Sequence, residues 1–240
     1  MTTTSQVALS YQSALSNQMD VAANNIANMS TTGFQGSRPM FAEFLAKVDS
    51  DGTQISYVED LGTVRDTNQG PLAFTGNRLD VGIQGEGYFV VEDGGEFLFT
   101  RNGNFQVDED GRLITSNGAV VMDEQDNPIV FGPDEVNIDI SRDGVVRTDN
   151  GEIATLRLVT FANQQDMEHR GSSMFFTEQI PFEAADTEVV QGMLEGSNVV
   201  AITEMTRMIE ILRRYQSAAQ LITQEEDREE EAIDILTRTV

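Results

Sequence analysis

Cysteine and tryptophan are both absent from this 240-residue chain, and histidine occurs only once. The lack of cysteine excludes disulfides, thiolate chemistry and cysteine-ligated metals together. The single histidine, His169, has no nucleophile or orienting partner that the sequence identifies, so the residues needed for a catalytic triad are missing. These absences remove several classes of enzyme before any motif is considered.

Basic residues are also scarce, with 15 Lys and Arg against 40 Asp and Glu and a formal net charge of −25. Binding of nucleic acid requires clustered Lys and Arg, so we expect no nucleic-acid partner. The charge is unevenly distributed along the chain. Residues 35–198 carry a net charge of −20 and residues 199–240 a net charge of −4, whereas residues 1–34 contain one charged side chain, Asp20.

Long apolar runs are missing as well. No stretch approaches 18 apolar residues, so we expect no direct membrane insertion. The first residues, MTTTSQVALSYQSAL, contain neither a basic segment nor a compact apolar segment, which argues against a cleaved signal peptide.

Apolar residues recur at helical spacing between Val7 and Met29. Steps of four and three residues predict a helix with a heptad seam and very little charge, followed by Gly33 as its stop. We take this seam as a candidate subunit interface that includes Leu15, Met19, Ala22, Asn25, Ile26 and Met29.

A second heptad seam occupies the other end of the chain. Asn198 is a candidate helix cap, and neither Gly nor Pro interrupts residues 199–240. The candidate interface residues of this seam are Ala201, Met205, Met208, Leu212, Tyr215, Ala219 and Ile222. Heptad helices pair or bundle, and the pattern leaves open whether the two helices close a hairpin within one chain or pack between subunits.

The middle of the chain has a different residue pattern from the two ends. Residues 36–78 predict an extended connector, and residues 79–195 alternate β-rich runs with DG, NG and GG turns typical of hairpins. VDEDGRLITSNG (107–118) and ISRDGVVRTDNG (140–151) resemble each other and predict two similar hairpins. The expected fold class is α+β. Residues 1–35 and 196–240 are expected to form a coiled-coil-like helical inner domain, and residues 79–195 a central, hairpin-rich all-β domain.

Motifs for enzymatic chemistry are weak. QGEGYF (84–89) lacks the Lys-Ser/Thr and the following helix of a phosphate loop. The loop at 106–117 resembles part of a calcium loop but has Gln106 and Asn117 at its first and last ligand positions. The acidic run EEDREEE (225–231) is typical of a solvated helix surface. We therefore expect no enzyme, no cofactor and no metal site.

Three blocks carry a family resemblance. ANNIANMSTTGF (23–34) resembles the N-terminal signature of the flagellar axial proteins, the rod and hook family. TRNGNFQVDEDGRLITSNG (100–118) is similar to the central block of that family, and LEGSNV (194–199) with EMTRMI (204–209) is similar to its C-terminal signature. The blocks occur in the family's order and span almost the whole chain. The short chain and the LEGSNVV form favour the proximal type of rod protein over the distal type.

The resemblance implies a structural subunit, exported by the flagellar type III apparatus without cleavage. Such a subunit polymerises helically through its terminal helices into the periplasmic rod, and that rod transmits motor torque. The implied partners are other copies of the chain and the neighbouring proximal and distal rod proteins. Two alternatives remain: the distal type of rod protein, and a secreted β-rich binding or adhesin module with a helical stalk.

Overall fold

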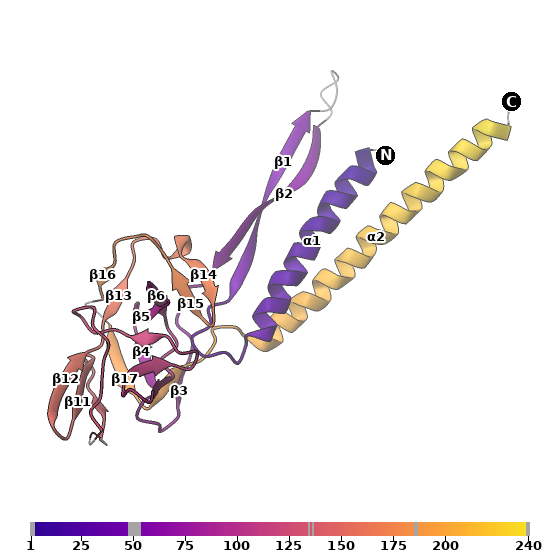
Figure 1. The fold of residues 1–240 in the computed structure, drawn as a ribbon. Coiled ribbons are helices and arrows are strands. Elements are labelled where there is room, and N and C mark those ends of the chain that lie inside the picture. Colours follow the sequence, from indigo (N-terminus) through magenta and orange to yellow (C-terminus); the bar gives the residue numbers. More distant parts are fainter. Residues whose placement is uncertain (1–2, 48–53, 134, 136, 185–186, 239–240) are drawn as a thin grey trace. The chain divides into compact units, whose positions relative to one another are not determined.

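The computed structural model describes residues 3–47, 54–133, 135, 137–184 and 187–238 (Figure 1). The chain forms two compact units, each assembled from separated segments. Unit 1 consists of Met1–Ala27, Ser37–Arg65 and Val200–Val240, and unit 2 of Asn28–Gly36 and Asp66–Val199. The chain therefore passes between the units four times.

Unit 1 contains the two helices and one long hairpin. Its elements are α1 (Thr3–Ala27), β1 (Ser37–Lys47), β2 (Gln54–Arg65) and α2 (Ala201–Arg238). Neither helix contains Gly or Pro, which is consistent with their length. The helices lie side by side and antiparallel, and α2 continues beyond the N-terminal end of α1 (Figure 1).

The stretch 36–78 differs from the connector that the sequence favoured. Strands β1 and β2 pair antiparallel from Ser37↔Arg65 to Lys47↔Gln54, with a bulge between Met40 and Phe41. The irregular side-chain pattern of this stretch gave no indication of strands. The two strands are held together by pairing of their backbone groups, which that pattern does not report. The remaining residues of the stretch belong to unit 2.

Unit 2 is built from short strands. They are β3 (Leu72–Phe74), β4 (Val81–Gln84), β5 (Tyr88–Asp93), β6 (Glu96–Thr100), β7 (Phe105–Val107), β8 (Leu113–Thr115), β9 (Val120–Val121), β10 (Asp139–Ile140), β11 (Val145–Thr148), β12 (Gly151–Thr155), β13 (Leu158–Thr160), β14 (Glu168–Gly171), β15 (Met174–Phe176), β16 (Phe182–Glu183), β17 (Glu188–Gln191) and β18 (Met193–Glu195), with a 3₁₀ turn at Gln164–Asp166.

The largest sheet has the order β14-β15-β6-β5-β9-β8-β7, and β13 joins it to β16. Smaller sheets pair β10-β11-β12, β17-β4 and β18-β3. Strand β5 separates two apolar cores, because successive side chains of a strand point to opposite faces. Phe89 and Val91 belong to one core, and Tyr88 and Val90 belong to the other.

The two hairpins predicted from the internal similarity are present. One joins β7 to β8 through Asp108–Gly111, and the other joins β10 to β11 through Ser141–Gly144. Gly111 and Gly144 have φ values of +81° and +82°, which favour glycine at both turns. The two terminal helices and the β-rich centre confirm the α+β class. None of the helices in the described part of the chain has the length and apolarity needed to cross a membrane.

Candidate functional site

The facing surfaces of α1 and α2 form a small apolar cluster. Leu15 and Ala22 of α1 and Ile211 and Ala218 of α2 are buried in it, and Met19, Met208 and Tyr215 pack against it. Three members of the predicted N-terminal seam, Leu15, Met19 and Ala22, thus contact the other helix of the same chain. This packing occurs inside unit 1 and leaves other helix surfaces available.

The predicted C-terminal seam is divided between two faces of α2. Met208 and Tyr215 lie on the face toward α1, but Met205 and Leu212 are 42% and 44% exposed. Successive residues of a helix are about 100° apart, so Leu212 points about a quarter turn away from the buried Ile211. With Ile202 and Ile209, which are also exposed, these residues form a row that we call the outer face of α2 (Ile202, Met205, Ile209 and Leu212).

The other predicted seam residues have varied positions. Ala201, Ala219, Ile222 and Ile26 are half-buried, and Met29 is exposed beyond the end of α1. Asn25 is buried, and its amide forms two hydrogen bonds with the backbone of Ser37, donating to the carbonyl at 2.8 Å and accepting from the N–H at 2.9 Å. In unit 1, Asn25 therefore ties the last turn of α1 to the first residue of β1.

The expected roles of Asn198 and Gly33 at helix ends are wrong. Helix α2 begins instead with backbone bonds to the Val200 carbonyl, and α1 ends at Ala27. Asn198 joins separate segments of unit 2. Its side-chain oxygen accepts from the Gly36 N–H at 2.8 Å, and its Nδ2 donates to the carbonyls of Asp66 and Asn68. Three of the four chain passages between the units lie close to Gly36, Asp66 and Asn198. The Asn198 side chain therefore holds these three segments together inside unit 2.

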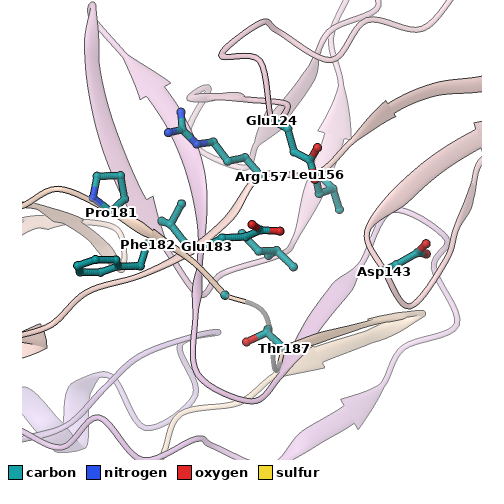
Figure 2. A pocket seen from close by; sticks show the side chains of 11 residues that line it. Glu124, Asp143, Leu156, Arg157, Pro181, Phe182, Glu183 and Thr187 are labelled. Atoms are coloured by element: carbon teal, nitrogen blue, oxygen red, sulfur yellow. The ribbon is translucent and has the colours of Figure 1, made fainter.

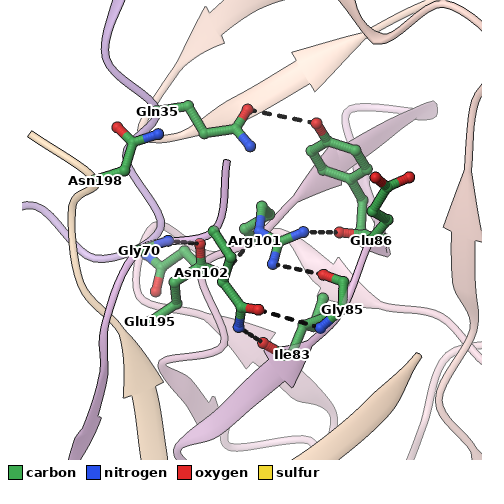
Figure 3. A network of polar contacts seen from close by, with 12 residues as sticks. Gln35, Gly70, Ile83, Gly85, Glu86, Arg101, Asn102, Glu195 and Asn198 are labelled. Atoms are coloured by element: carbon green, nitrogen blue, oxygen red, sulfur yellow. Dashed lines mark hydrogen bonds and ion pairs between the residues drawn. The ribbon is translucent and has the colours of Figure 1, made fainter. Parts of the chain in front are cut away.

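A buried ion pair lies in the same part of unit 2 (Figure 3). Arg101 Nε and Glu195 Oε2 are 2.7 Å apart, and their side chains are 3% and 2% exposed. Arg101 also donates to the carbonyls of Gly85 and Gly87, and Glu195 Oε1 accepts from the Gly70 N–H at 2.9 Å. Each guanidinium nitrogen of Arg101 and each carboxylate oxygen of Glu195 therefore has a hydrogen-bond partner.

Glycines allow the backbone segments around this pair to approach closely. A Cβ on Gly70 would lie 2.1 Å from the Gly196 carbonyl oxygen, and one on Gly33 would lie 2.7 Å from the Asn102 nitrogen. Gly33 also donates its N–H to the Glu195 carbonyl at 2.8 Å. The three signature blocks, represented by Gly33, Arg101 and Glu195, therefore meet in one junction. The sequence contains the three blocks but carries no local signal that they meet in space.

Desolvation determines the protonation behaviour of this junction. Burial raises the pKa of the Glu195 carboxyl above its ordinary value, while attraction to Arg101 and the bond from Gly70 lower it in part. The net direction is upward. The folded environment therefore disfavours the charged carboxylate despite its partner, as is usual when an ion is removed from water.

A separate pocket of about 480 Å³ opens in unit 2 (Figure 2). Glu124, Asp143, Glu183 and Arg157 line it, and Arg157 forms an ion pair with Asp126. The hydrogen bond from the Ser141 hydroxyl lowers the pKa of Asp143, so this carboxyl is a poor proton donor. Among the described lining residues there is no histidine, and the hydroxyl of Thr187 donates to the Glu86 carbonyl. The pocket presents no nucleophile paired with a base.

Three protein-family models match the chain in order. The flagella basal body rod protein model matches residues 6–35, the flagellar hook protein FlgE/F/G D1 domain matches 82–148, and the flagellar basal body rod FlgEFG protein C-terminal model matches 190–235. These segments contain both helices and much of unit 2.

Whole-chain comparisons agree with the family models. The flagellar basal-body rod protein FlgF of Caulobacter vibrioides is 34% identical over 239 residues, covering 96% of each chain. FlgF of Rhizobium meliloti is 34% identical over 233 residues with the same coverage. FlgG of Bacillus subtilis is 30% identical over 246 residues, covering 91% of this chain and 93% of its own.

The chain belongs to the flagellar axial family of rod and hook proteins. Within that family it is a structural subunit of the flagellar basal-body rod, and other rod subunits are its partners. The family is structural and is not a family of enzymes. The resemblance inferred from the three sequence blocks is confirmed.

Proposed function

We propose that the chain occupies the proximal part of the rod and polymerises there through its terminal helices. The FlgF relatives align with 96% of this chain, whereas the FlgG relatives align with 82–91% of it. The LEGSNVV form of the C-terminal block fits the same assignment. We propose export by the flagellar type III apparatus, without a cleaved signal peptide, to a periplasmic rod that transmits torque.

The observation that carries this proposal is the outer face of α2. Ile202 and Ile209 are 72% and 53% exposed, and they form one continuous row with Met205 and Leu212. Fully burying an aliphatic side chain contributes about 1.5–3 kcal/mol, so a row of four repeated in every subunit is a substantial driving force for assembly. A coiled-coil-like contact between subunits would cover this row, while Ile211 and Ala218 remain covered by α1.

The low charge of α1 supports the same location. Asp20 is the one charged residue of that helix. Charged side chains packed at small radius among many copies would lose hydration and repel one another at each repeat of the helical assembly. Unit 2 can keep its charge solvated outside such a core, and that charge discourages premature association of free subunits.

Two adjacent substitutions on α2 test the proposal. Leu212→Asp places a carboxylate on the outer face, where the free subunit tolerates it and the assembled rod would bury it at a cost of several kcal/mol. We expect a normal circular dichroism spectrum and melting curve but no completed rod and no motility. Ile211→Asp is the matched control, because it should lower helix content and stability in the free subunit.

Normal rod assembly with Leu212→Asp would contradict the proposal.

The proximal assignment has its own test. The chain should restore motility to a strain that lacks its FlgF-type rod protein and should not restore a strain that lacks its FlgG-type protein.

A further inference from the structure

A groove of about 350 Å³ lies in unit 1 between α1, β1 and the first half of α2. Its floor is apolar and includes Val21, Ala22 and Ile211. Three arginines line it, Arg38, Arg207 and Arg214, together with the carboxylates of Glu204 and Glu210. In a chain with 40 acidic and 15 basic residues, such a concentration of arginine around an apolar floor is unusual.

In a single subunit, the carboxylate of Glu204 in this groove has one oxygen that no described residue satisfies. The residue is 8% exposed, and its Oε1 accepts a hydrogen bond from Arg207 Nη1 at 2.8 Å. Its other oxygen, Oε2, is buried and has no hydrogen-bond partner among the described residues. A buried carboxylate oxygen left unsatisfied costs free energy, so the groove favours an occupant that brings a donor as well as acidic groups for the arginines.

The far end of α2 has the complementary charge pattern. Residues 217–238 contain seven acidic and two basic side chains, whereas residues 201–216 contain two acidic and three basic ones. In the run Glu225–Glu231, six carboxylates surround one arginine, Arg228. Ile233, also on this end, is 62% exposed. This end of α2 continues past α1 (Figure 1). Its exposed side chains include both charged and apolar residues.

We propose that the acidic end of α2 from one subunit binds in the arginine-lined groove of a second subunit. Carboxylates of Glu225–Glu231 pair with the groove arginines, Arg228 supplies the donor that Glu204 Oε2 lacks, and Ile233 covers apolar surface. This contact rests on the proposed polymerisation and specifies one of its interfaces.

The contact has to join two subunits because α2 is a continuous helix. At about 1.5 Å per residue, the 23 residues between Arg207 and Glu230 hold these side chains roughly 35 Å apart in the same subunit. If the contact is head-to-tail rather than reciprocal, it is heterologous, and a heterologous contact whose rotation does not close generates an open helical polymer. The geometry of the contact therefore fits a rod subunit.

The absence of cysteine makes cross-linking a clean test. Full-length chains carrying Gln18→Cys in the groove or Glu230→Cys on α2 are mixed in equal amounts and oxidised at low salt. We expect the mixed disulfide dimer to exceed, by about tenfold, the product formed when an exposed control, Glu109→Cys, replaces Glu230→Cys. In about 1 M salt the screening length falls to roughly 3 Å, and the excess should disappear.

A matched pair of arginines tests the chemistry of recognition. Arg214 lines the groove, whereas its exposed neighbour Arg213 is not among the lining residues. Arg214→Glu in the Gln18→Cys chain should reduce the mixed product to the control yield, and Arg213→Glu should leave the excess in place. Equal yields with the Glu109→Cys control, or equal effects of the two arginine changes, would overturn the proposed contact. Failure of this contact would not affect the Leu212→Asp test of polymerisation, because the residues of the outer face do not line the groove.

Discussion

At the scale of single residues, the most constrained part of the protein is the pair Arg101–Glu195. Burial raises the pKa of Glu195, and the guanidinium and the Gly70 N–H offset this only in part. The pair joins residues that are 94 positions apart in the chain. A buried ion pair whose nitrogens and oxygens each have a hydrogen-bond partner orients backbone segments, although it contributes little net stability.

The pH dependence of stability follows from the raised pKa of Glu195. Because the folded chain binds this proton more tightly than the unfolded chain, the carboxyl's contribution is complete below its unfolded-state pKa and declines as pH rises through its folded-state pKa. Glu195→Gln removes this dependence. We expect the free energy of unfolding of the wild type, minus that of the variant, to fall as the pH rises from about 4, the ordinary pKa range of a glutamate.

Urea denaturation across this pH range measures the difference, and Glu109→Gln is the control for an exposed carboxyl. A difference that increased with pH would show that attraction to Arg101 outweighs desolvation.

At the scale of elements, α2 has two apolar faces, and the interface proposed above lies on the face that α1 leaves exposed. The face with Ile211 and Ala218 is covered by α1, and the outer face remains exposed. Helix α1 is fixed at its end by Asn25, whose amide replaces two backbone hydrogen bonds that Ser37 would otherwise make with water.

Asn25→Ala tests this attachment of α1 to β1. Two backbone groups of Ser37 would lose their buried partner, so we expect unit 1 to be destabilised by about 1–3 kcal/mol. Hydrogen exchange of the Ser37 amide should accelerate, and the helical melting transition should move to lower temperature. Ser13→Ala on the exposed side of α1 is the control and should change neither measurement. Unchanged exchange at Ser37 in the Asn25 variant would contradict the role assigned to that amide.

At the scale of the whole molecule, the two units differ in the size of their apolar cores. Four buried residues form the cluster between α1 and α2, whereas unit 2 contains two larger clusters that include Phe89, Phe105 and Leu113. Helices depend on packing of an apolar face for most of their stability, so the free subunit should open first in unit 1.

Hydrogen exchange of the free subunit measures this order of opening. We expect amides of α1 and α2 to exchange faster than those of β5 and β6, with the difference reduced or reversed after assembly covers the outer face. Limited proteolysis should cut within α1 or α2 before it cuts these strands. Slow exchange throughout the helices of the free subunit would mean that α1 alone stabilises α2 sufficiently.

Local patterns in the sequence were sufficient for the two helices, the two similar hairpins of unit 2 and the family, but not for the β1–β2 hairpin. Heptad spacing and the lack of Gly and Pro predicted both helices, and the DG turns predicted the paired hairpins, because these features depend on neighbours within a few residues. The same spacing could not show that Ile211 is buried and Leu212 exposed. Apolar residues at both positions fit two adjacent heptad seams equally well.

Tertiary contacts alone decided the roles of Asn198, Gly33 and Asn25. A Ser, Asn or Gly near a helix end satisfies the local rules for a cap or a stop, yet Asn198 binds segments more than 100 residues away and Gly33 makes room for the backbone of Asn102. The junction of Gly33, Arg101 and Glu195 likewise depends on chain segments that meet only after folding. The sequence by itself thus determined the two helices, the similar hairpins of unit 2 and the family. The tertiary structure decided which faces of the helices are buried and which stay exposed, because burial depends on distant parts of the chain.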